Sequence, residues 1–176
     1  MRPIHVVLTG PRAVGKSTIG LEVARRLEMR FVDLDEMVLD RFSESSVVDV
    51  WNAHGEDAWR EMECLVLGDL LREPSLVLAL GGGVPTIPLA VEQLNAARQR
   101  DAAVIIWLQA DPDELASRLE SSTGDRPSLT GRTPAEEIAE ISRARASSYR
   151  MVSDITLDVG AMEVSQVVDS VLAVLK

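Results

Sequence analysis

Eight residues near the start of the chain have the types and spacing of a phosphate-binding loop. The stretch GPRAVGKS, residues 10–17, fits the pattern G-x-x-x-x-G-K-[ST] without a mismatch. In such a loop the glycines let backbone N–H groups surround a phosphate, and the helix that follows adds partial positive charge. A lysine placed like Lys16 reaches the β- and γ-phosphates, and a hydroxyl placed like Ser17 ligates Mg²⁺. The segment therefore predicts a nucleotide site that uses magnesium.

The basic residues are distributed unevenly, and this supports the same interpretation. The chain has sixteen arginines and only two lysines, Lys16 and Lys176. The chain uses arginine almost everywhere else, yet it has lysine at position 16. This indicates that the position needs a compact ammonium point charge rather than a planar guanidinium.

A GTPase switch is the main alternative from another functional class. Such switches need a D-x-x-G segment at the γ-phosphate and an N-K-x-D segment that reads guanine. Neither pattern occurs, and the only asparagines are Asn52 and Asn95. The sequence therefore favours a phosphotransferase over a switch.

Two carboxylates lie at the end of the second expected strand. In Asp33-Leu34-Asp35, alternation at a strand end places Leu34 opposite the two acids. One acid can position hydrated Mg²⁺, and the other can accept a proton from an attacking hydroxyl. The alternative is that Asp35 only caps the following helix.

Three consecutive glycines, Gly81 to Gly83, end the apolar run of residues 75–80. Three glycines cost backbone entropy and contribute no packing. Either they form a flexible turn before Pro85, or a ligand must lie directly against bare backbone at this point.

The elements that would position these groups alternate along the chain. We expect strands at residues 4–9, 31–33, 75–80, 103–108 and 154–159 and helices at residues 17–28, 36–42, 46–53, 56–72, 89–100, 111–120, 133–150 and 164–175. This alternation predicts a three-layer α/β sandwich with a five-stranded parallel sheet flanked by helices, the P-loop NTPase fold. Residues 121–133 have the most loop-like composition.

Length and composition predict one domain, residues 1–176. The chain is 46% hydrophobic, has a net charge of −10 and contains one cysteine, Cys64. The acidic balance argues against nucleic-acid and anionic-membrane partners. One cysteine allows no internal disulfide, and no apolar run has membrane-spanning length, so we expect a cytoplasmic monomer.

Six segments together resemble the shikimate kinase family. They occur in the family's order and approximate spacing across nearly the whole chain, and they are residues 10–18, 33–35, 59–63 (WREME), 81–83, 125–127 (DRP) and 145–149 (RASSY). The resemblance implies transfer of the γ-phosphate of ATP to the 3-hydroxyl of shikimate, on the route to chorismate and the aromatic amino acids. It also implies a substrate-binding helical segment at about residues 34–62 and a lid at about residues 121–133. A gluconate-type sugar-acid kinase on the same scaffold is the alternative.

The resemblance also implies roles for individual residues. Asp35 matches the presumed base that contacts the substrate hydroxyls, and Asp33 matches the acid near Mg²⁺. Arg60 and Arg145 match the pair that binds the shikimate carboxylate, although spacing alone also fits charged helix surfaces. The implied nucleotide contacts are Gly10, Ala13, Val14, Gly15, Lys16, Ser17, Thr18, the lid arginine Arg126 and, near adenine, Arg118. Gly81, Gly82 and Gly83 match a run whose N–H groups meet the substrate and the γ-phosphate.

Overall fold

Five short runs rich in apolar residues pair side by side into one parallel sheet. The computed structural model describes residues 4–120 and 134–175. The strands are β1 (His5–Thr9), β2 (Arg30–Asp33), β3 (Leu76–Ala79), β4 (Ala103–Gln109) and β5 (Ile155–Asp158). Their order across the sheet is β2-β3-β1-β4-β5, and every pair is parallel. The predicted five-stranded parallel sheet is therefore confirmed.

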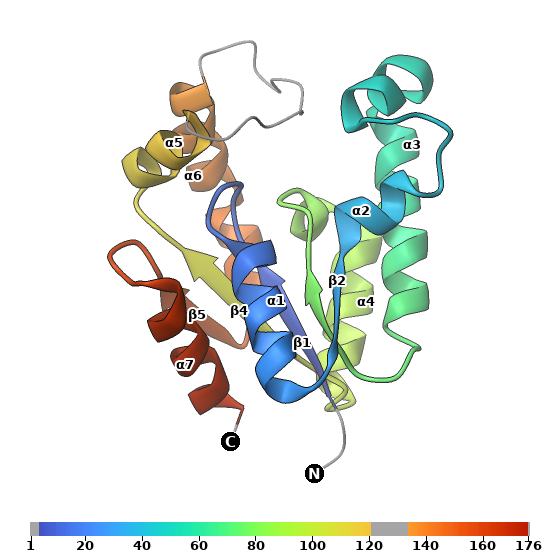
Figure 1. The fold of residues 1–176 in the computed structure, drawn as a ribbon. Helices are drawn as coiled ribbons and strands as arrows, with labels where there is room; N and C mark the ends of the chain where they lie inside the picture. Colours follow the sequence, from blue (N-terminus) through green and yellow to red (C-terminus); the bar gives the residue numbers. More distant parts are fainter. Residues whose placement is uncertain (1–3, 121–133, 176) are drawn as a thin grey trace.

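Helices cover both faces of this sheet (Figure 1). They are α1 (Lys16–Leu27), α2 (Leu34–Leu39), α3 (Val47–Leu70), α4 (Pro88–Gln99), α5 (Pro112–Glu120), α6 (Pro134–Val152) and α7 (Val164–Val174). Helices α1 and α7 contact each other on one face, and α3 and α4 contact each other on the other. The three layers of the predicted sandwich are thus present, with one 3-10 turn, η1 (Val84–Thr86), that the sequence did not predict.

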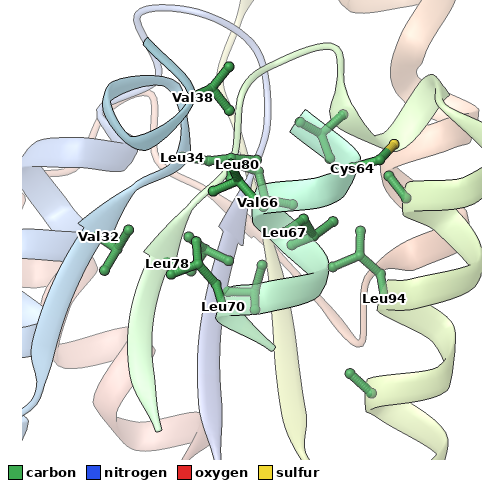
Figure 2. Close-up of a cluster of buried hydrophobic side chains, with 14 of the residues drawn as sticks. Val32, Leu34, Val38, Cys64, Val66, Leu67, Leu70, Leu78, Leu80 and Leu94 are labelled. Atoms are coloured by element: carbon green, nitrogen blue, oxygen red, sulfur yellow. The ribbon is translucent and has the colours of Figure 1, made fainter. Parts of the chain in front are cut away.

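The core lies in two clusters, one on each face of the sheet. In β1 the side chains alternate, so that Val6 and Leu8 pack toward α1 and α7 while Val7 packs toward α3 and α4. Figure 2 shows the cluster on the face covered by α3 and α4, where Leu78 of β3 lies near Leu70 of α3. Strands β1 and β3 are buried along their whole length, and this burial on both faces fixes where these two strands end.

The carboxyl ends of the strands bring the three predicted functional segments to one edge of the sheet. The loop of residues 10–15 follows β1, Asp33 ends β2, and the glycine run follows β3. In the register of the sheet, Ala79 of β3 lies opposite both Leu8 and Asp33. Parallel strands of matched register therefore place these segments next to one another, the usual location of a ligand site in such folds.

The segment between β2 and β3 forms α2 and α3. Ser46 caps α3 by accepting a hydrogen bond from Asp49 N at 3.1 Å. Gly55 interrupts the helix with φ 83° and ψ 167°, a conformation that glycine adopts without strain. The predicted separation between helices at residues 46–53 and 56–72 is thus confirmed, with Gly55 dividing α3 into two helical segments.

No helix within residues 4–120 and 134–175 is both long and apolar enough to cross a membrane.

Candidate active site

The loop between β1 and α1 has the curled backbone of a phosphate-binding loop. Gly10, Ala13 and Gly15 all have positive φ, with values of 143°, 61° and 95°. A Cβ on Gly10 would collide with the backbone oxygen of Leu108, so glycine is required there. A loop that turns through such left-handed conformations points several N–H groups toward one concavity, which suits an anion. The motif predicted from sequence therefore has the expected shape and lies between a strand and a helix.

Lys16 folds over this loop. Its Nζ donates hydrogen bonds to Gly10 O at 2.9 Å and to Pro11 O at 2.8 Å. The ammonium group is thereby held at the rim of the concavity, next to the N-terminus of α1. A phosphate in the loop would meet both the lysine and the positive end of the helix.

Asp33 joins the loop to the second carboxylate. Its Oδ2 accepts a hydrogen bond from Ser17 Oγ at 2.6 Å, and its Oδ1 accepts one from Asp35 N at 3.0 Å. The second bond makes Asp33 the cap of α2. The alternative that Asp35 is the helix cap is therefore wrong.

A cavity of about 400 Å³ contains most of the predicted residues. It is lined by Arg12, Ala13, Gly15, Lys16, Ser17, Thr18, Asp33, Asp35, Leu80, Gly82, Arg118 and Leu119. Val14 is 1% exposed and packs in the core, so its side chain is turned away from the cavity. Phosphate-binding groups and the candidate base thus share one space.

The glycine run is packed against side chains of the protein. A Cβ on Gly81 would lie 2.6 Å from Asp35 Oδ1 and 2.7 Å from Glu63 Oε1, and one on Gly83 would lie 2.5 Å from Arg60 Nη1. A Cβ on Gly82 would meet nothing closer than 3.5 Å. Gly81 and Gly83 therefore leave room for neighbouring side chains, and Gly82 is the one that borders the cavity. The expectation that a ligand accounts for all three glycines is too simple.

Arg60 points inward from α3. Its guanidinium donates to Glu63 Oε2 at 2.7 Å and to Glu56 Oε1 at 2.8 Å, and it lies 5.8 Å from the ring centroid of Trp51. The side chain is only 19% exposed. The alternative of a solvated salt-bridge face is thus wrong for this residue, because its charge is held in a partly buried network.

Glu63 is a site residue that the sequence analysis missed. It is 1% exposed, and burial raises the pKa of its carboxyl above the ordinary value, an effect that Arg60 and, more weakly, Arg145 oppose. The signal was available, because Glu63 occupies a core position in the helical spacing of Trp59, Glu63, Leu67 and Leu70. An acid at such a position needs a cationic partner.

Arg145 and Tyr149 lie one helical turn apart on α6. Tyr149 donates a hydrogen bond from its hydroxyl to Gly82 O at 2.8 Å, and its ring stacks on Trp107 at a centroid distance of 5.7 Å. Burial raises the pKa of Tyr149 to about 12, although Arg145 opposes this, so the hydroxyl remains a donor at neutral pH. Arg145 therefore lies close enough to Glu63 and Tyr149 for its charge to act on both.

Arg118 reaches the loop after β5. Its Nη2 donates to Gly160 O at 2.9 Å, and the residue also lines the phosphate-site cavity. Arg126 and the predicted lid at residues 121–133 lie outside the described residues.

The strand order, the loop after the central strand and the cavity beside it define a P-loop nucleotide-binding protein. The sequence model of the family described as "Shikimate kinase" matches residues 12–176. The chain belongs to the shikimate kinase family.

Individual relatives agree with this assignment. A protein named "Shikimate kinase" from Caldanaerobacter subterraneus is 34% identical over 96% of this chain and 94% of its own length. A "Shikimate kinase 2" from Escherichia fergusonii is 36% identical over 96% of this chain and 90% of its own length. Among solved structures, shikimate kinase from Acinetobacter baumannii in complex with shikimate has a TM-score of 0.85 at 24% identity, over 98% of this chain and 93% of that one. This last similarity confirms the fold.

Proposed function

We propose that this protein transfers the γ-phosphoryl group of ATP to the 3-hydroxyl of shikimate, giving shikimate 3-phosphate and ADP. Family membership supports the reaction, and the structure offers one observation that carries it: Lys16 and Ser17 of the phosphate-binding loop line the same cavity as Asp35. A phosphoryl donor and an acceptor hydroxyl can therefore meet without a large rearrangement of the described elements.

Donor binding is assigned to the loop of residues 10–18. Its N–H groups and Lys16 hold the phosphates, and Arg118 lies toward the base. Ser17 Oγ and the Asp33 carboxylate, 2.6 Å apart, are hard oxygen donors suited to Mg²⁺ and one of its waters. When bound there, Mg²⁺ neutralises charge on the phosphates.

Acceptor binding is assigned to Asp35, Arg60, Arg145 and the glycine run. Asp35 receives the proton of the attacking hydroxyl, a role that fits its place in the cavity. Two arginines supply the planar, paired donors that a carboxylate favours. We further assign residues 34–62 to acceptor binding and residues 121–133, with Arg126, to a lid that closes over the phosphates.

An acceptor panel tests the proposal. Release of ADP is measured with shikimate, with gluconate and without acceptor, at equal ATP and Mg²⁺. We expect shikimate to have the highest kcat/KM, because its rigid ring loses less conformational entropy on binding than an open-chain sugar acid. Arg60→Ala and Arg145→Ala should each raise the KM for shikimate strongly and leave the KM for ATP nearly unchanged. If gluconate is preferred, the acceptor assignment is wrong; if no acceptor increases ADP release, the phosphotransferase assignment is wrong.

A further inference from the structure

The peptide between Gly82 and Gly83 is held by a side chain from a distant element. Tyr149, on α6, donates its hydroxyl hydrogen to the Gly82 carbonyl at 2.8 Å, across 67 positions of the sequence. Tyr149 is 1% exposed, so this bond is shielded from water. A shielded hydrogen bond to a carbonyl is costly to lose, because the carbonyl then has no solvent partner.

This bond fixes the direction of a donor as well as that of the carbonyl. In a planar trans peptide the C=O and N–H groups point in opposite directions, so the Gly83 N–H points away from Tyr149. Within the described part of the chain, no protein acceptor is paired with the N–H of Gly82 or of Gly83. Both donors are thus available to a ligand. The direction of the Gly83 N–H depends on Tyr149, whereas the Gly82 N–H belongs to the Gly81–Gly82 peptide, whose carbonyl accepts from Val84 N at 3.1 Å.

Both ends of the tyrosine are anchored. Its ring stacks on Trp107 of β4, with an interplanar angle of 30°. Its hydroxyl is bonded to Gly82, and Gly82 in turn borders the phosphate-binding loop. A Cβ built on Gly82 would lie 3.5 Å from Gly10 O and 3.8 Å from Arg12 N. A line of contacts therefore runs from the central part of the sheet through Tyr149 and Gly82 to the loop that holds the phosphates.

We propose that Tyr149 is a positioning residue, which orients the Gly82–Gly83 peptide so that its one N–H, that of Gly83, faces the reacting phosphoryl group and the acceptor. Tyr149 itself touches neither reactant. Because α6 also carries Arg145, one helix sets both the arginine that binds the acceptor carboxylate and the backbone donor beside the acceptor hydroxyl. This inference rests on the proposed function for the identity of the acceptor, but not for the hydrogen bond.

Tyr149→Phe tests the idea, because it keeps the ring on Trp107 and removes the hydroxyl. That hydroxyl also interacts with the side chain of Arg145, so the effect on kcat/KM is read together with the Gly83 amide resonance below. Ser153→Ala is a matched control: Ser153 Oγ donates to a backbone carbonyl, Tyr149 O, at 2.7 Å at the same end of α6, without reaching the glycine run. We expect Tyr149→Phe to lose about tenfold in kcat/KM for shikimate, the scale of one hydrogen bond to a buried group. Ser153→Ala should retain the wild-type kcat/KM for shikimate. If the two variants have similar Tm, the difference in kcat/KM is not an effect of lost stability.

A second measurement does not depend on the acceptor. In ¹⁵N-labelled protein without ligands, the amide resonance of Gly83 should shift or broaden in Tyr149→Phe and stay in place in Ser153→Ala. An unchanged Gly83 resonance would overturn the inference, as would a changed resonance with wild-type kcat/KM. Failure of the wild-type protein to phosphorylate shikimate would instead overturn the proposed function. The Gly83 resonance would then be the remaining test of whether Tyr149 orients the Gly82–Gly83 peptide.

Discussion

Glu63 holds Arg60 in place from within the protein. The two residues lie one helical turn apart on α3, the guanidinium Nη1 donates to Glu63 Oε2 at 2.7 Å, and the glutamate is 1% exposed. Arg60 also pairs with Glu56, but that side chain is 49% exposed. Exposed ion pairs contribute little, whereas breaking a buried pair leaves a charge without compensation. The position of Arg60 should therefore depend on Glu63 far more than on Glu56.

Substitution of these two acids makes this difference measurable. Glu63→Gln retains the shape but not the charge, and we expect it to raise the KM for shikimate about tenfold, the scale of one charge-assisted hydrogen bond. The KM for ATP should hardly change. Glu56→Gln, the matched control on the same arginine, should change either KM less than about twofold. Equal effects of the two variants on the KM for shikimate would show that burial of Glu63 is not what positions Arg60.

Loss of the Asp35 carboxylate should remove catalysis but not the cap of α2. Asp35→Asn should bind nucleotide normally and lose roughly 10²-fold or more in kcat, because an amide cannot accept the proton of the acceptor hydroxyl. Its Tm should stay close to that of the wild type, since Asp33 caps α2. Turnover and nucleotide affinity are measured together. Normal turnover of Asp35→Asn would exclude it as the base.

Two substitutions in the glycine run should have different effects, one on the reaction with shikimate and the other on protein stability. Gly82→Ala should fold normally, because its Cβ would meet only ordinary contacts of 3.5 Å or more. Its methyl group would nevertheless border the cavity, so kcat/KM for shikimate should fall. Gly81→Ala should lower Tm, because its Cβ would displace the carboxylates of Asp35 and Glu63. Wild-type kinetics for Gly82→Ala would show that no reactant approaches this backbone.

His5 should make the stability of the fold depend on pH. It is 4% exposed at the start of β1, and burial lowers the pKa of its imidazole below the ordinary value of about 6.5, against smaller raising effects of Leu71 and Glu73. Below pH 6.5 the unfolded chain therefore binds more protons at this site than the folded one, and stability falls as pH falls. The contribution of one such group is at most about 1.4 kcal/mol per pH unit.

Urea unfolding at pH 7.5 and 5.5 measures this dependence. We expect His5→Gln to show a smaller loss of unfolding free energy between the two values than the wild type does. His54→Gln, which changes the exposed second histidine, controls for the loss of a histidine as such. An identical pH dependence in His5→Gln and wild type would mean that His5 is not the titrating group.

The sequence predicted what depends on local pattern. Residues 10–17 specify their own loop, because glycine positions, lysine and hydroxyl lie within one turn between a strand and a helix. Asp33 and Asp35 could be placed because they follow a strand end directly. The helix break at Gly55 also follows from a local property, the backbone freedom of glycine.

The remaining features of the site depend on tertiary contacts and could not be predicted from the sequence. Asp33 caps α2 through Oδ1, while its Oδ2 accepts a hydrogen bond from Ser17, which lies sixteen positions away in the chain. The burial of Arg60 depends on Glu63 and Trp51 together, and the contact between Tyr149 and Gly82 joins elements that no periodicity relates. These interactions are determined by how the layers pack, so single-segment patterns do not reveal them.

The position of the phosphate on the product tests the central claim most directly. Wild-type protein is incubated with ATP, Mg²⁺ and shikimate, and the product is analysed by mass and by ¹³C–³¹P coupling in NMR spectra. The account predicts one phosphate per molecule, esterified at the 3-hydroxyl, and loss of this product in Asp35→Asn. Esterification at another hydroxyl, or consumption of ATP without a phosphorylated shikimate, would contradict it.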